Sequence, residues 1–169
     1  MSIRDGMVAI LLVMGSPAWA QAQDLSAWEG TFRGNCQNLR PGTGGQKLEF
    51  TIERQVAAIP GTDRYEWRST YNGGAPGTGK NYQLAPVNPA KGHYQIDEGN
   101  GVRIDTYLSG DTFYAHFKVG NTQITSVERL KGNELIMELL SFEARELSPT
   151  ASVSTYRFQV NQRCVMRRN

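Results

Sequence analysis

The 169-residue sequence contains only two histidines and two cysteines, and its formal net charge is only +2. Two histidines without cysteine pairs at ligand spacing do not make up a zinc or transition-metal site, so neither a metal nor a cofactor is expected. The small net charge argues against a surface made to bind nucleic acid. No apolar run of membrane length and no nucleophile-elbow or H-E-x-x-H motif is present, which leaves a small, soluble mature protein without a recognisable catalytic signature.

Residues 1–20 have the parts of a cleavable signal peptide. Arg4 gives a short positive region, and residues 7–14 form an uncharged apolar run that is too short to span a bilayer. Ala18 and Ala20 then place small residues where a signal peptidase reads the chain. We therefore expect cleavage before Gln21, with a cut after Ala22 as the second choice. The product is then a periplasmic or secreted protein of residues 21–169, a length that suits one domain.

The two cysteines lie near the two ends of the mature chain, at Cys36 and Cys164. An even number of cysteines in an exported protein favours a disulfide. A bridge between these positions would close a loop of nearly the whole domain and would remove much conformational entropy from the unfolded chain.

Short stretches of alternating apolar and polar residues recur along the mature sequence, bounded by Gly, Pro, Asn or Asp. This period of two is typical of half-buried antiparallel strands. Only residues 141–147 have helical composition, and Pro149 would end that helix within two turns. Strands are expected at 28–36, 47–54, 64–71, 80–86, 93–97, 102–108, 113–119, 122–130, 134–142 and 152–165.

The turns between the later strands keep the apolar residues on one face. Gly110-Asp111, Gly120-Asn121 and Gly132-Asn133 are suitable hairpin turns, and with them the apolar positions stay in register across four strands. A meander of about ten strands exposes two edges unless it closes. Cys36 and Cys164 fall on the inward parity of the terminal strands, so we predict an all-β, antiparallel up-and-down barrel of eight to ten strands with at most one short helix.

The export signal, the first strand Leu25–Phe32, the meander and the arginines of the last strand together resemble a distant lipocalin-like (calycin) family of exported bacterial proteins. In that group a Trp beside a Gly on the first strand closes the barrel floor under an Arg from the last strand. The resemblance implies that Trp28 has this place and that Arg157 or Arg163 covers it. It also implies a cup-shaped cavity for a small apolar ligand.

The first functional hypothesis is therefore a binding protein for a small hydrophobic or amphipathic molecule. Aromatic residues on the inward parity would line or fill the cavity. The candidate ligand-binding residues are Phe32, Phe50, Trp67, Phe113, Phe117, Tyr156 and Phe158.

The second hypothesis is a barrel-type cyclase, isomerase or lyase. A turn at residues 110–111 would set Tyr107 opposite Tyr114 and Asp105 opposite His116, and an Asp that orients a His can move protons. In the alternating pattern of their strands, these four residues lie on the face opposite to the apolar residues. They act in catalysis only if that face points inward, and otherwise they form an ordinary solvated surface.

The third hypothesis concerns residues 74–81, Gly-Ala-Pro-Gly-Thr-Gly-Lys-Asn, which approach the phosphate-binding loop pattern. Asn81 replaces the hydroxyl residue that holds Mg²⁺, and Pro86 and Pro89 prevent the helix that should follow. No nucleotide is expected here. The segment is instead expected to be a flexible loop at the barrel mouth, and the hypothesis is an interaction module, such as an envelope inhibitor of a hydrolase, that works through the Gly-rich loop 72–80 and without a cavity.

Overall fold

The computed structural model describes residues 24–42, 47–147 and 152–169, so the predicted signal peptide lies outside the described residues. All ten predicted strands are present, and most extend beyond their predicted ends. Their bounds are β1 Gly30–Leu39, β2 Lys47–Ala58, β3 Tyr65–Tyr71, β4 Lys80–Asn88, β5 His93–Asp97, β6 Arg103–Ser109, β7 Thr112–Val119, β8 Thr122–Lys131, β9 Glu134–Glu146 and β10 Tyr156–Arg168.

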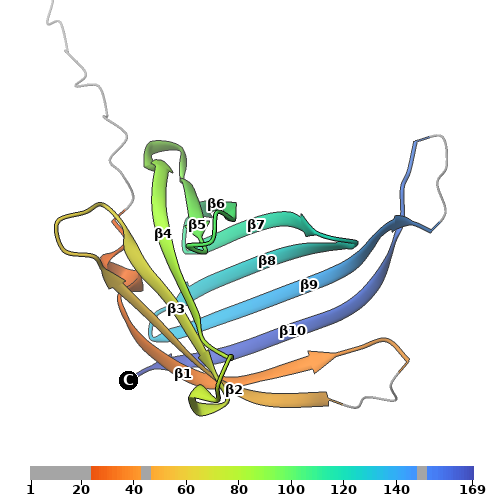
Figure 1. Ribbon diagram of the computed structural model, residues 1–169, viewed down its shortest axis with the longest axis horizontal. Helices are drawn as coiled ribbons and strands as arrows, with labels where there is room; N and C mark the ends of the chain where they lie inside the picture. Colours follow the sequence, from red (N-terminus) through yellow and green to blue (C-terminus); the bar gives the residue numbers. More distant parts are fainter. Residues whose placement is uncertain (1–23, 43–46, 148–151) are drawn as a thin grey trace, which may run out of the picture.

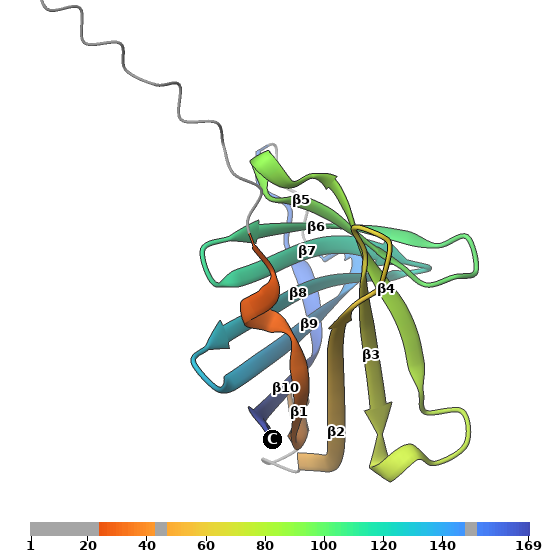
Figure 2. The same ribbon diagram turned by 90° about the vertical axis from the view of Figure 1, so that its left-hand side faces the viewer.

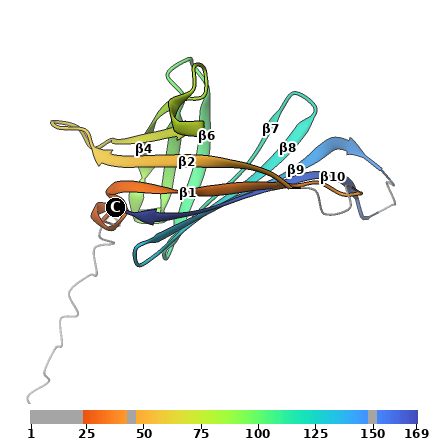
Figure 3. The same ribbon diagram turned by 90° about the horizontal axis from the view of Figure 1, so that it is seen from below.

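The strands form a closed barrel in which every neighbour in the sequence is a neighbour in space (Figure 1). β1 pairs antiparallel with β2 on one side and with β10 on the other, and Figure 3 shows β1 lying between these two strands. This arrangement confirms the predicted all-β, up-and-down barrel. Closure gives each of the ten described strands two partners and leaves none of them as an exposed sheet edge.

The predicted helix at 141–147 is wrong. Ser141–Glu146 are the last residues of β9, which pairs with β8 through Glu143 and with β10 through Glu146. Hydrogen bonding to strands on both sides outweighs the weak helix propensity of this short segment. Helical turns in the described residues are the short 3₁₀ segments η1 Ser26–Trp28, η2 Asn72–Gly74 and η3 Pro89–Lys91. None of the described helices has the length and apolar character needed to cross a membrane.

Aromatic side chains close one end of the barrel, which we call the floor. The turn η1 leads into β1 (Figure 2) and places Trp28 inside, where it is 3% exposed. The Trp28 ring centre lies 4.9 Å from that of Phe113 and 5.8 Å from that of Trp67. Such tilted and edge-on contacts between buried rings are favourable beyond the apolar area that they bury. The opposite end, where residues 72–79 connect β3 to β4, is the mouth.

The arginine at the floor is Arg168, so the expectation of Arg157 or Arg163 is corrected. Arg168 pairs in register with Phe32, and its guanidinium lies over the Phe32 ring and donates to the carbonyl of Ala27. Arg157 and Arg163 instead form exposed ion pairs along the sheet with Glu143 and Glu138 at 3.4 and 3.5 Å.

The predicted disulfide is confirmed. Cys36 and Cys164 are register partners on β1 and β10, both are fully buried, and they are bonded to each other. Two residues earlier, a Cβ on Gly34 would collide with the backbone of Val165 and Met166. The first and last strands therefore approach closely beside the bridge, at a position that only glycine fits.

Candidate functional site

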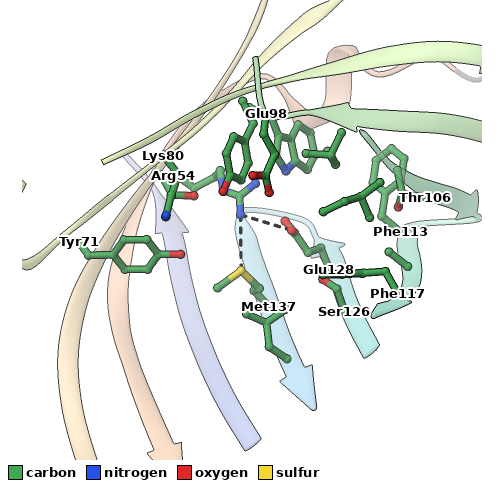
Figure 4. Close-up of a pocket in the computed structure, with 17 residues that line it drawn as sticks. Arg54, Tyr71, Lys80, Glu98, Thr106, Phe113, Phe117, Ser126, Glu128 and Met137 are labelled. Atoms are coloured by element: carbon green, nitrogen blue, oxygen red, sulfur yellow. Dashed lines mark hydrogen bonds and ion pairs between the residues drawn. The ribbon is translucent and has the colours of Figure 1, made fainter. Parts of the chain in front are cut away.

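The barrel encloses a cavity of about 220 Å³ between the floor and the mouth (Figure 4). Its wall combines two kinds of side chain. The apolar lining residues are Trp67, Ile96, Ile104, Phe113, Ala115, Phe117, Met137 and Leu139. The polar ones are Arg54, Ser69, Tyr71, Lys80, Tyr82, Glu98, Thr106, Ser126 and Glu128.

An ion pair between Arg54 and Glu128 lies inside this cavity. Arg54 is on the inward face of β2 between the buried residues Ile52 and Val56 and is itself only 4% exposed. Its Nη2 lies 3.3 Å from Oε1 of Glu128 on β8 and 3.5 Å from the sulfur of Met137 (Figure 4). The guanidinium also lies 5.1 Å from the Trp67 ring centre, a favourable cation–π distance.

This ion pair leaves several of its polar atoms without partners. The Nε and Nη1 of Arg54 and the Oε2 of Glu128 are buried and have no hydrogen-bond partner among the described residues. Burying such atoms unpaired costs free energy. The ion pair therefore keeps unsatisfied donors on Arg54 beside an unsatisfied acceptor on Glu128, buried in the cavity wall.

The mouth side of the cavity carries a second group of polar residues. The Tyr82 hydroxyl donates to the Glu98 carboxylate, and Lys80 begins the same strand as Tyr82. The pKa of Tyr82 is raised to about 12, chiefly by burial and then by the nearby Glu98 charge, while the Arg54 charge opposes this shift. Tyr82 is therefore a neutral phenol at physiological pH.

Three of the seven predicted ligand-binding aromatics line the cavity, namely Trp67, Phe113 and Phe117. Phe32 lies in the floor and is fully buried. Phe50 contacts Tyr71, with 5.9 Å between the ring centres, and does not line the cavity.

The remaining two aromatics, Tyr156 and Phe158, lie away from the cavity. Irregularities in the β9–β10 pairing on both sides of Phe158 shift the alternation of β10. Phe158 therefore packs on Phe142, with 5.7 Å between the ring centres, on the face opposite to Met137 and Leu139. Tyr156 is 37% exposed. Because of these bulges, counting alternate residues back from Cys164 assigns Phe158 and Tyr156 to the wrong face of β10.

The predicted acid–base cluster lies on the outside of the barrel. Tyr107 and Tyr114 pair as expected but are 50% and 42% exposed. Asp105 contacts Nε2 of His93 at 2.7 Å rather than His116, and this contact is the main cause that lowers the pKa of Asp105. The interior arrangement that catalysis by these four residues requires is therefore absent.

The other member of that cluster, His116, is also exposed. Its Nδ1 lies 3.0 Å from the hydroxyl of Thr125 on β8, which is ordinary cross-strand pairing on a solvated face. Across residues 24–42, 47–147 and 152–169, no three His, Cys, Asp or Glu side chains are placed to hold a metal ion.

Residues 74–81 run from the connection at the mouth into β4, which pairs antiparallel with β3. A phosphate-binding loop instead follows a parallel strand and begins a helix. The Thr78 hydroxyl lies within hydrogen-bond distance of two carbonyl oxygens, that of Tyr71 at 2.8 Å and that of Ala75 at 2.6 Å. Lys80, the lysine of the pattern, lines the cavity.

Sequence reasoning missed Arg54 and Glu128, although a signal for both was available. Arg54 has the same parity as Ile52 and Val56, and Glu128 has the same parity as Leu130. A charged residue at a position that alternation assigns to the core is a functional signal, because such a charge is costly unless it is paired.

Comparison with known proteins gives a likeness in fold. No family model matches the sequence, and no curated protein matches it. The structure is similar to the crystal structure of a protein of unknown function from the DUF3598 family of Nostoc punctiforme, with a TM-score of 0.64 and 6% identity. The match covers 88% of this chain and 50% of the other, so this chain spans about half the length of that protein.

Proposed function

We propose that this protein is an exported, lipocalin-like binding protein that holds one small hydrophobic or amphipathic molecule inside its barrel. The cavity of about 220 Å³, with its apolar wall and its incompletely bonded ion pair, is the observation that carries the proposal. Binding sites are typically concave and mostly apolar, with a few polar groups that fix orientation.

The volume suggests the size of the ligand. An apolar cavity of about 150 Å³ is sufficient for benzene, so 220 Å³ suits a molecule of one or two rings. Trp67, Phe113 and Phe117 would contact its apolar body. Long-chain lipids would extend through the mouth into solvent.

Export is supported by the signal-peptide pattern of residues 1–20 and by the buried disulfide. Stable structural disulfides belong to oxidising compartments. Expression of the full chain in an export-competent bacterium, followed by cell fractionation and intact mass measurement, tests this part. We expect a periplasmic or secreted product that begins at Gln21; an unprocessed cytoplasmic product would contradict it.

Binding is tested with Ala115→Phe, which fills the cavity from β7, against Thr125→Phe on the outer face of β8. Native mass spectrometry and titration with toluene and indole are the measurements. We expect wild type and Thr125→Phe to bind one molecule and Ala115→Phe to bind none. Failure of wild type to bind any apolar compound would overturn the proposal.

A further inference from the structure

The Arg54–Glu128 pair leaves part of its hydrogen-bonding capacity unused. Arginine and carboxylate commonly form a fork of two parallel hydrogen bonds, but here a single contact joins Nη2 to Oε1 at 3.3 Å. Two Arg54 nitrogens and the second Glu128 oxygen stay unpartnered within the described residues. A ligand that satisfies this site must accept hydrogen bonds from Arg54 and donate one to Glu128.

The charges around the cavity are already balanced. Arg54 and Lys80 are cationic and Glu98 and Glu128 are anionic among its lining residues. An ionised ligand would bring an uncompensated charge next to Arg54, which is 4% exposed, and an unpaired charge in such a place is costly. A neutral ligand avoids this cost.

We propose that the cavity selects uncharged, one-ring molecules that carry a carboxamide or an equivalent acceptor–donor pair. The carbonyl oxygen accepts from Arg54, and the adjacent N–H donates to Glu128. The inference rests on the proposed function, because it names the class of ligand that the barrel holds.

The apolar part of the cavity wall suits the ring of such a molecule. Phe113 and Phe117 on β7 and Ile104 on β6 line the same cavity as Arg54 and Glu128. Figure 4 shows both phenylalanines on the same side of the cavity as Glu128, with the guanidinium of Arg54 facing them across the space. A ring against these side chains would place its carboxamide toward the ion pair.

The decisive experiment uses four compounds that share one ring and differ in the attached group. Toluene, benzamide, benzoate and benzylamine are titrated into the wild-type protein by calorimetry and ligand-observed NMR. We expect benzamide to bind at least about tenfold more tightly than the other three, because only benzamide satisfies both sides of the pair without adding charge.

Two variants test the roles of the two residues. Glu128→Gln removes the negative charge and leaves Arg54 uncompensated, so the ratio of benzoate to benzamide affinity is expected to rise at least about tenfold. The double variant Arg54→Met with Glu128→Leu makes the site apolar, and its preference for benzamide over toluene should fall to about threefold or less. Arg163→Met with Glu138→Leu, on the outer face, is the matched control and should keep the wild-type order.

The outcomes separate this inference from the proposed function. Toluene binding without a preference for benzamide overturns the inference and keeps the binding function. Tighter binding of benzoate or benzylamine to wild type overturns it as well. If none of the four compounds binds, both the inference and the proposed binding function are overturned. If a variant fails to fold, the titrations of the wild-type protein decide the question by themselves.

Discussion

The guanidinium carbon of Arg168 lies 4.9 Å from the centre of the Phe32 ring, and this contact joins the last strand of the barrel to the first. The same guanidinium donates to the carbonyl of Ala27 in the turn that carries Trp28. Arg168 thus holds the floor to the seam between β1 and β10. A substitution here should act on stability more strongly than one at its exposed neighbour.

Arg168→Met removes one charge-assisted hydrogen bond and one cation–π contact. We expect the free energy of unfolding to fall by about 1–2 kcal/mol, measured by urea denaturation. Arg167→Met is the control, since that side chain is 83% exposed and lies 3.9 Å from Glu134; it should change stability by less than about 0.5 kcal/mol. Equal effects of the two variants would contradict the role given to Arg168.

The effects of substituting Arg54 and Glu128 on the free energy of unfolding should be strongly coupled. Glu128→Leu leaves the buried Arg54 without its counter-charge and should lower the free energy of unfolding by about 3 kcal/mol. Adding Arg54→Met should restore stability to within about 1 kcal/mol of wild type, because an apolar pair needs no charge compensation. Glu138→Leu, which breaks an exposed pair with Arg163, should cost about 0.5 kcal/mol or less. If the losses of unfolding free energy in the two single variants add up to the loss in the double variant, the double-mutant cycle contradicts this coupling.

The disulfide should be inaccessible in the native state and important for its stability. Cys36 and Cys164 are fully buried and are separated by 128 residues in the sequence. Replacing both with serine should destabilise the protein by up to about 5 kcal/mol through the entropy of the unfolded chain. Free-thiol assays in dithiothreitol should show slow reduction without urea and rapid reduction in denaturing urea; rapid reduction of the native protein would contradict the burial.

Alkaline pH should weaken the fold through Tyr82. Its pKa is raised to about 12 in the folded protein, chiefly by burial and then by Glu98, whereas an unfolded tyrosine titrates near 10. The contribution of the neutral phenol is therefore fully present below about pH 10 and is lost as the pH rises toward 12. Urea midpoints measured from pH 9 to 12 should fall less steeply for Tyr82→Phe than for wild type. Tyr107→Phe, on the exposed outer face, should follow wild type.

The ten strands were predictable because alternation, Gly-containing turns and the positions of the cysteines all favoured the same barrel. Where local composition was the sole guide, prediction failed. Residues 141–147 have helical composition but continue β9, because their backbone groups pair across the sheet. Alternation likewise failed for Phe158, where bulges that are invisible in the sequence shift the face of β10.

The candidate site was only partly predictable. Trp67, Phe113 and Phe117 followed from their parity, and they line the cavity. Arg54 and Glu128 are 74 residues apart in the sequence, and only barrel closure brings β2 and β8 to face each other across the interior. The side chain of Asp105 contacts His93 rather than His116, because β5, which carries His93, is the other neighbour of β6.

The pairing of β1 with β10 makes the order of strands cyclic. The amide of Asn169 donates to the carbonyl of Thr31 at 3.0 Å, so the start of β1 and the end of β10 lie side by side, as Figure 3 shows. A short peptide link between them would let the chain be reopened in the connection 72–79 as a circular permutant. Such a permutant would keep every strand pair and the Cys36–Cys164 bridge, and would place new chain ends beside the cavity mouth.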